Sequence, residues 1–498
     1  MTTARVRTST AGVALAVSLA AAPASAFDAR VDAALDAQYY AIRSPFGEPS
    51  LSRRRYTSSL GLELMNLQGE WHPRRASYAF RSRLRVDSDF GIDAREFTAR
   101  SQGYVPGLSP APLEVLYTYL EGSGLAGGLL GFRLGRQYQV DSLGYWSFDG
   151  ALVELRLPVA LMLSGYAGFE QRTGLPMLAS GRFSGDGVWR GNRDGLETGQ
   201  FPAYLEESKL APALGASLET QGFEYLHARF SYRRVQNRSR VLVSPFLPTN
   251  ADPEFYQATR TSSERAAASL DLNIPNAAVL SSRAIYDLLL DRVTTATASL
   301  DGYIGSRLQL GALVDYFFPS FDGDSIFNWF TRRARTTTEA RIGYAFTPEL
   351  SLSVASGLRW FERGAASDAW LVESGGRSAA VLARANARYY TGLTTLTLDA
   401  SAERAESAHS VGADVTGRRL FSGGRYDTLA IVSLYDFASD TRADRSATSF
   451  SYVLGAGVRP GPGFNSRSRL GFEWEHSMSR LVGQRFRVLL TLDLTVAP

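Results

Sequence analysis

The feature that most constrains the fold is a two-residue alternation of apolar and polar side chains, clearest in residues 77–87. Its apolar positions are Tyr78, Phe80, Leu84 and Val86, and its polar positions are Arg81, Arg83, Arg85 and Asp87. Because successive side chains of a β-strand point to opposite faces, this period predicts a strand with one apolar and one charged face. An unpaired charge is costly to bury, so the arginine face must be wet.

The same alternation recurs in segments of about ten residues from Val31 to Val496. We therefore expect an all-β fold, a single antiparallel transmembrane β-barrel of about 20–22 strands, apolar outside and polar inside. We identify 21 such segments. A further, weak segment near Val411–Thr416 would make 22, and the loss of one segment within 263–303 would make 20. A soluble sandwich, propeller or solenoid would not put so many charges on its inner face.

The N-terminus predicts export. Arg5 and Arg7 precede an apolar stretch over 11–22, and Ala24-Ser25-Ala26 has the small-x-small pattern of a cleavage site. The stretch is too short to cross a bilayer as a helix. We expect residues 1–26 to be a signal peptide and residues 27–498 to form the barrel, located in the cell outer membrane.

Composition excludes several classes of function. There is no cysteine, which removes disulfides, thiolate metal sites and a cysteine nucleophile. The formal net charge of +4 falls further when Arg5 and Arg7 leave with the signal peptide, so charge gives no reason to expect a nucleic-acid partner. Asp322-Gly323-Asp324, Asp186 and Asp194 lack the ligand spacing of a dedicated calcium loop, and we expect no metal and no cofactor.

Connector lengths support the barrel independently. Short turns such as Thr347–Glu349 alternate with the long connectors 89–110, 170–207, 238–261, 318–335 and 362–377. Barrels place short turns in the periplasm and long loops outside. Segment 170–207 is the candidate to plug or narrow the lumen. The last strand resembles the closing strand of outer-membrane barrels, which the assembly machinery recognises, although it ends Val496-Ala497-Pro498 rather than on an aromatic residue.

Residues 130–150 carry a local resemblance. They read Leu-Gly-Phe-Arg-Leu-Gly-Arg-Gln over 130–137, with Asp141 and then Trp146-Ser147-Phe148-Asp149-Gly150. This stretch resembles the strand and loop of substrate-specific porins and of alginate-exporter-like barrels. The resemblance implies that Arg133, together with Arg136, lies on a pore wall. The alternative is that Arg133 merely pairs with Glu154 or Asp141.

Charged residues on the wet faces are the candidate pore-lining residues. They are Arg81, Arg83, Arg85, Arg133, Arg229, Arg233, Arg467, Arg469, Arg485, Arg487, Glu473 and Asp493. Many of these arginines come from the two ends of the chain, which meet when a barrel closes. We therefore expect an arginine-rich wall at the seam that selects anions, since rings of charge set pore selectivity. The alternative is that Glu473, Glu475 and Asp493 neutralise it.

These patterns lead us to expect a porin-like outer-membrane channel, without enzymatic activity, for passive passage of small solutes with a preference for anions. The alternatives are a conduit for secretion of an exopolysaccharide, working with a periplasmic export partner, and a structural or surface-attachment barrel. A lipid hydrolase built on His476-Ser477 or His409-Ser410 is disfavoured, because adjacent strand residues point to opposite faces. Expected partners are outer-membrane lipid, lipopolysaccharide and the barrel-assembly machinery. The oligomeric state stays open.

Overall fold

The structure, a computed structural model, describes residues 27–69, 75–89, 113–171, 211–242, 255–320, 333–362, 379–405, 408–439, 446–459, 468–480 and 483–496. They form one sheet of 22 strands. The strands are β1 (Asp28–Arg43), β2 (Pro49–Met65), β3 (Ser77–Asp89), β4 (Leu113–Leu125), β5 (Leu130–Asp141), β6 (Gly144–Leu157), β7 (Leu161–Glu170), β8 (Ala211–Thr220), β9 (Leu226–Leu242), β10 (Phe255–Ile274), β11 (Ala278–Asp287), β12 (Arg292–Ile304), β13 (Leu308–Phe317), β14 (Arg335–Ala345), β15 (Leu350–Phe361), β16 (Ala379–Thr391), β17 (Thr394–Ala405), β18 (Ala408–Phe421), β19 (Tyr426–Ser439), β20 (Ala447–Val458), β21 (Arg469–Ser479) and β22 (Gly483–Val496).

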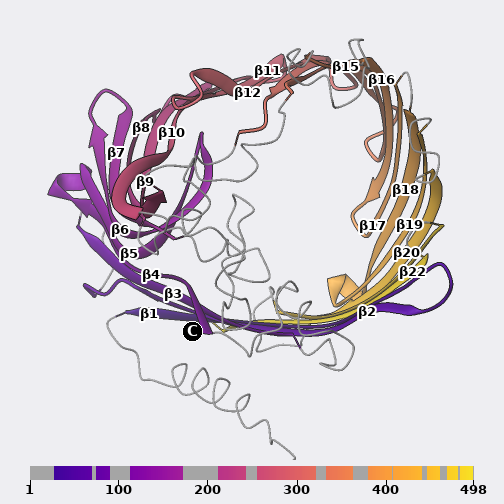
Figure 1. Cartoon of the computed structure of the whole chain (residues 1–498), viewed down its shortest axis with the longest axis horizontal. Helices are drawn as coiled ribbons and strands as arrows, with labels where there is room; N and C mark the ends of the chain where they lie inside the picture. Colours follow the sequence, from indigo (N-terminus) through magenta and orange to yellow (C-terminus); the bar gives the residue numbers. More distant parts are fainter. Residues whose placement is uncertain are drawn as a thin grey trace, which may run out of the picture.

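The sheet closes on itself. Each strand pairs antiparallel with the next along the chain, and β22 pairs with β1 from Val31↔Val496 to Arg43↔Gln484. Figure 1 looks into the resulting ring, in which the yellow C-terminal strands lie beside the indigo N-terminal ones. Closure leaves no edge strand in the described sheet, which is what lets a sheet enter the hydrocarbon core of a membrane.

The two faces of the wall differ as the alternation predicts. On one face, rung partners on β13, β14 and β15 are large and apolar, with Leu310 44%, Ile342 51% and Val354 43% exposed. On the other face, the neighbouring rung brings Gly311 beside Arg341, which pairs with Asp301. An apolar outer surface around a charged interior is the arrangement of outer-membrane β-barrels. The expected fold is confirmed.

Connector lengths sort by end of the barrel. The connectors 90–112, 171–210, 243–254, 318–334 and 362–378 all follow odd-numbered strands and therefore leave from one end. Turns such as 158–160, 275–277 and 392–393 follow even-numbered strands and lie at the other end, where β1 begins and β22 finishes. We assign the first end to the cell exterior and the second to the periplasm.

No helix within the described ranges is both long enough and apolar enough to span a bilayer.

Three details refine the expected strands. The weak segment near Val411–Thr416 is the full strand β18, and none of the segments within 263–303 is lost, so the count takes the upper value. The expected long connector 238–261 is wrong in its bounds, because β9 continues to Leu242 and β10 starts at Phe255, with a bulge between Thr261 and Ser263. These extensions are polar and rich in arginine, so they lack the alternation that predicts a strand. Residues 1–26, the expected signal peptide, lie outside the described residues.

Candidate pore constriction

Among the described residues, the hairpin of β5 and β6 is the part of the wall that enters the lumen. Its strands join through a tight turn, in which the backbone N–H of Leu143 donates to Asp141 Oδ1 at 2.7 Å and Gly144 adopts a φ of +100°. A short polar side chain accepting from the backbone two residues on, followed by a residue with positive φ, is ordinary hairpin chemistry. The turn at the tip is therefore set by local sequence.

A row of three glycines lies where this hairpin leaves the wall. Gly135, Gly150 and Gly168 are rung partners on β5, β6 and β7. A Cβ on Gly135 would lie 2.3 Å from the carbonyl oxygen of Thr118, and one on Gly150 would lie 2.2 Å from that of Ala167. Strand glycines mark close backbone approach and sharp bends. The row lets the sheet bend here, and beyond Arg136 the strand β5 no longer pairs with β4.

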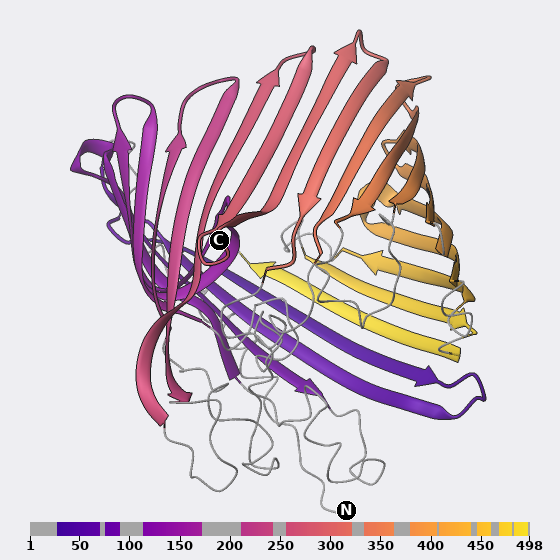
Figure 2. The same cartoon turned by 45° about the horizontal axis from the view of Figure 1, so that its top comes forward.

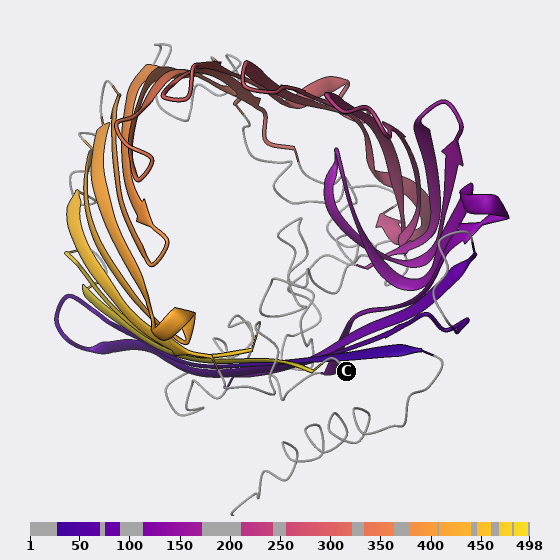
Figure 3. The ribbon, with the colours of Figure 1, turned by 180° about the vertical axis from the view of Figure 1, so that it is seen from behind.

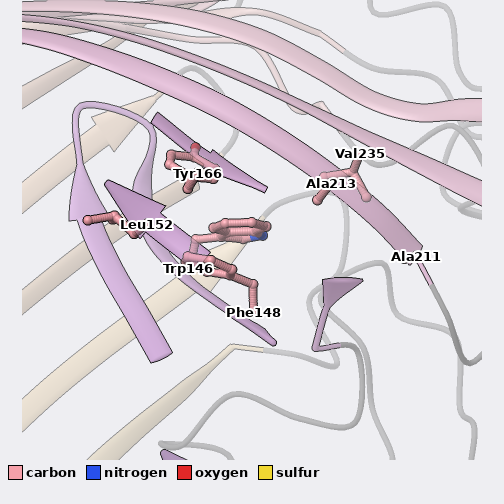
Figure 4. Packing of buried hydrophobic residues seen from close by; sticks show 7 residues of the cluster. All are labelled: Trp146, Phe148, Leu152, Tyr166, Ala211, Ala213 and Val235. Atoms are coloured by element: carbon pink, nitrogen blue, oxygen red, sulfur yellow. The ribbon is translucent and has the colours of Figure 1, made fainter. Parts of the chain in front are cut away.

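One face of the bent hairpin packs against the inner face of β7 to β9. Trp146 stacks on Phe148, with ring centroids 4.4 Å apart and an interplanar angle of 17°, and both rings contact Tyr166 of β7. The cluster, shown in Figure 4, is completed by Leu152, Ala211, Ala213 and Val235. Phe148 is fully buried. Burying side chains of this size stabilises the seated hairpin by about 1.5–3 kcal/mol each.

The opposite face of the hairpin lies against β4. The ring of Tyr138 is 5.7 Å from that of Tyr117, and Arg136 donates to the carbonyl of Val115 at 3.0 Å. Arg136 is held in turn by Asp149 at 2.7 Å. The hairpin is thus clamped between two parts of the same wall.

The tip reaches across to β9, β10 and β11. Ser142 Oγ lies 2.8 Å from Ser269 Oγ, and Arg283 Nε donates to the carbonyl of Ser142 at 2.7 Å. Arg229 donates to the carbonyl of Val140 at 3.1 Å and also pairs with Glu219. Arg229, Ser269 and Arg283 share one rung. Because all three contact the hairpin tip, this rung faces the interior. Figures 1 and 3 show the purple segment turned into the ring.

Not every polar group around the seated hairpin is satisfied. Five buried atoms around it have no hydrogen-bond partner among the described residues: Gln137 Oε1, Gln139 Oε1, Tyr166 Oη, Ser231 Oγ and Arg233 Nη1. The Arg233 guanidinium carbon lies 5.2 Å from the centroid of the Trp146 ring and within the described chain has no carboxylate partner. Unsatisfied buried groups cost free energy, about 1–3 kcal/mol each. Their cost offsets part of the free energy gained by packing, so the hairpin is held against the wall less tightly than its aromatic contacts alone suggest.

The seam arginines are largely paired. Glu475 contacts both Arg485 and Arg487, the latter at 2.8 Å. Arg469 pairs with Asp427 at 2.8 Å. Glu473 and Asp493 lie on the same inner face, facing Leu489 and Arg469 in the register. Arg467 lies outside the described residues. These pairs favour the alternative in which carboxylates neutralise the seam arginines, here Glu475 and Asp427.

The other expected pore residues are distributed around the lumen. Arg81 lies 3.5 Å from Glu121, and Arg83 donates to Ser59 Oγ at 3.0 Å, while Arg85 is 7% exposed. Strands β1 and β2 separate them from β22. Arg133 pairs with Glu154 at 3.1 Å, whereas Asp141 caps the turn instead of pairing with it.

The inward hairpin was not predicted from the sequence, in which 130–150 was interpreted only through its resemblance to a strand and loop. In the structure β6 starts at Gly144. Asp141 and Gly144 with only two residues between them were the available signal, and the alternation of Trp146 and Phe148 extends the strand. Segment 170–207, Asp186, Asp194 and Asp322-Gly323-Asp324 lie outside the described residues, apart from 170 and 171.

The histidine–serine pairs are split between faces. His476 lies on the outer face, stacked on Phe486 with centroids 4.3 Å apart, and Ser477 faces Arg485 on the inner side. His409 is on the outer face, 3.7 Å from Asp436. Within the described ranges no three His, Asp or Glu side chains come together to hold a metal.

Comparisons with known proteins give structural matches only. No family model matches the chain, and no curated protein matches it by sequence. Among solved structures, OccAB4 of Acinetobacter baumannii is 8% identical with a TM-score of 0.43, covering 95% of this chain and 98% of that one. OccAB2 of the same organism is 8% identical with a TM-score of 0.45, covering 94% and 98%. OpdK of Pseudomonas aeruginosa, solved with vanillate, is 10% identical with a TM-score of 0.42, covering 94% and 99%. At such low identities and TM-scores, function has to be argued from the chain's own geometry.

Proposed function

We propose that this chain is a passive outer-membrane channel for small hydrophilic solutes. The observation that carries the proposal is a charged inner wall narrowed, but on the described residues not filled, by the β5–β6 hairpin. A barrel of this strand number encloses a lumen wide enough for water unless other parts of the chain fill it. The hairpin occupies the sector between β4 and β11, and the wall from β12 to β20 faces the interior with charged pairs such as Arg341–Asp301.

A preference for anions is part of this proposal and should be modest. Arg83, Arg233 and Arg283 are inner-face arginines without a carboxylate partner in the described chain. By contrast, Arg469, Arg485 and Arg487 of the last two strands are paired. Asp399 and Asp414, rung partners on the far wall, oppose them. Charges nearest the narrowest point weigh most on selectivity.

The narrowing by the hairpin also favours small solutes over an exopolysaccharide. We propose no catalytic role, since the described histidine–serine pairs are not assembled on one face. Contact with outer-membrane lipid follows from the apolar outer face.

Planar-bilayer recording tests the channel role. Replacing residues 138–147 with Asn-Gly should raise the single-channel conductance, because it removes the part of the hairpin that enters the lumen. The matched control is Leu289→Ala in the β11–β12 turn at the same end of the barrel. Absence of conductance in both wild type and the shortened variant would overturn the channel role.

A further inference from the structure

A groove on the outer surface, unrelated to the lumen, lies across the seam at the exterior end. It has a volume of about 550 Å³ and is lined by the β1–β2 turn, β20 and the β21–β22 turn. Phe450, Met478, Gln484 and Arg43 form one rung across β20, β21, β22 and β1. The indigo β1–β2 hairpin runs beside the yellow final strands in Figure 2.

The groove faces lipid rather than the lumen. Its rung has the parity of the exposed outer side chains, and Met478 is 40% exposed. One rung deeper into the membrane lie Tyr452, His476 and Phe486, with Tyr452 and His476 in an edge contact at 5.5 Å. Leu454 and Trp474 follow on the next rung. Aromatic belts mark the membrane interface, so the groove lies at the level of the outer-leaflet headgroups.

The charge of the groove is one-sided. Arg43 and Arg480 both line it, both are exposed, and neither makes an ion pair in the described chain. None of its described lining residues is acidic; Glu48 lies in the adjacent turn but does not line the groove. Two free guanidinium groups above an apolar floor are complementary to a phosphate attached to acyl chains, and arginine binds phosphate through paired hydrogen bonds.

Backbone packing brings together the two turns that carry these arginines. Gly483, at the start of β22, has a φ of +80°, and a Cβ there would lie 2.2 Å from the carbonyl oxygen of Arg43. The two turns that carry Arg43 and Arg480 are therefore in direct backbone contact at a position that only glycine fits without strain. This contact fixes the backbone positions from which the two arginine side chains project into the groove.

We propose that this groove is a binding site for a phosphorylated, acylated lipid of the outer leaflet, the lipid A portion of lipopolysaccharide. Its phosphate contacts Arg43 and Arg480, and its acyl chains run over Phe450 and Met478 toward the aromatic rungs. The site is independent of what passes through the lumen.

Native mass spectrometry of the full chain in detergent tests this, with bisphosphorylated lipid A, phosphate-free lipid A and phosphatidylglycerol as separate probes. The double variant Arg43→Gln/Arg480→Gln should bind bisphosphorylated lipid A at least about 10-fold more weakly than wild type. The control is Arg419→Gln, an exposed outer-face arginine at the periplasmic end, which should bind like wild type. Heat-modified gel migration verifies that each variant is folded.

Wild type should prefer bisphosphorylated lipid A over both other probes. Equal binding by the double variant and the Arg419→Gln control would overturn the site. Equal binding of phosphate-free lipid A would overturn phosphate recognition, and equal binding of phosphatidylglycerol would overturn lipid A as the occupant.

Discussion

Arg283→Ala should loosen the tip of the β5–β6 hairpin and open the channel further. Three hydrogen bonds attach the tip to β9, β10 and β11: one between Ser142 and Ser269, and one each from Arg229 and Arg283 to hairpin carbonyls. A bond from a charged donor contributes about 1.5–3 kcal/mol, and a neutral one about 0.5–1.5 kcal/mol. Losing the Arg283 bond should therefore shift the equilibrium between seated and released hairpin by about 10- to 100-fold.

Single-channel recording measures this as time spent in a state of higher conductance. The control is Arg388→Ala, which removes an inner-face arginine that stacks on Tyr390 far from the hairpin. The chain has no cysteine, so Ser142→Cys/Ser269→Cys can form a single defined disulfide that holds the tip. Oxidation should abolish the high-conductance state in an Arg283→Ala background, and reduction should restore it. If Arg283→Ala and wild type show the same conductance states, the tip contacts do not hold the constriction.

Three further outcomes follow from packing and charge. Gly150→Val should sharply lower the folded yield in urea-gradient refolding, because its Cβ would meet the Ala167 carbonyl at 2.2 Å, whereas Gly165→Val, with nothing within 4 Å, should refold like wild type. Arg485→Gln/Arg487→Gln should lower the urea midpoint of unfolding, because it leaves Glu475, which is 8% exposed, as an unpaired charge that costs about 1–3 kcal/mol. Adding Glu475→Gln should restore most of the lost stability, and a failure to restore it would contradict the pairing. Arg233→Gln should reduce anion preference in reversal-potential measurements more than Arg485→Gln does, and an equal effect of the two would argue against a constriction at the hairpin.

The barrel could be predicted from sequence because its signal is repeated in every strand. Period-two alternation needs only the chemical type of each residue, and a one-residue error would turn every apolar side chain to the wrong face. The bounds were harder to predict where strands extend past the membrane, as in β9 and β10, since both faces are then polar. The sequence Arg238–Arg240 reads as a loop but pairs with β10.

The hairpin could not be predicted from the same signal. Its alternation is that of a wall strand, and what turns it inward is the alignment of Gly135, Gly150 and Gly168 on one rung. Alignment depends on register between strands, which a single sequence does not reveal. Gly135 and Gly150 are visible as glycines in the sequence, but their joint effect appears only once the strands are paired.

The ion pairs also shift the expected source of selectivity from the seam to the hairpin. The arginines of 77–87 and of the last two strands predicted a charged wall at the seam, yet Glu475 binds two of them and Asp427 a third. A paired charge cross-links neighbouring strands and contributes little field to the lumen beyond the pair. Arg233 and Arg283, by contrast, have no carboxylate partner in the described chain, and both contact the hairpin. Since the field acts most strongly on a solute where the passage is narrowest, selectivity should depend on these two arginines, while the seam arginines should matter mainly for stability.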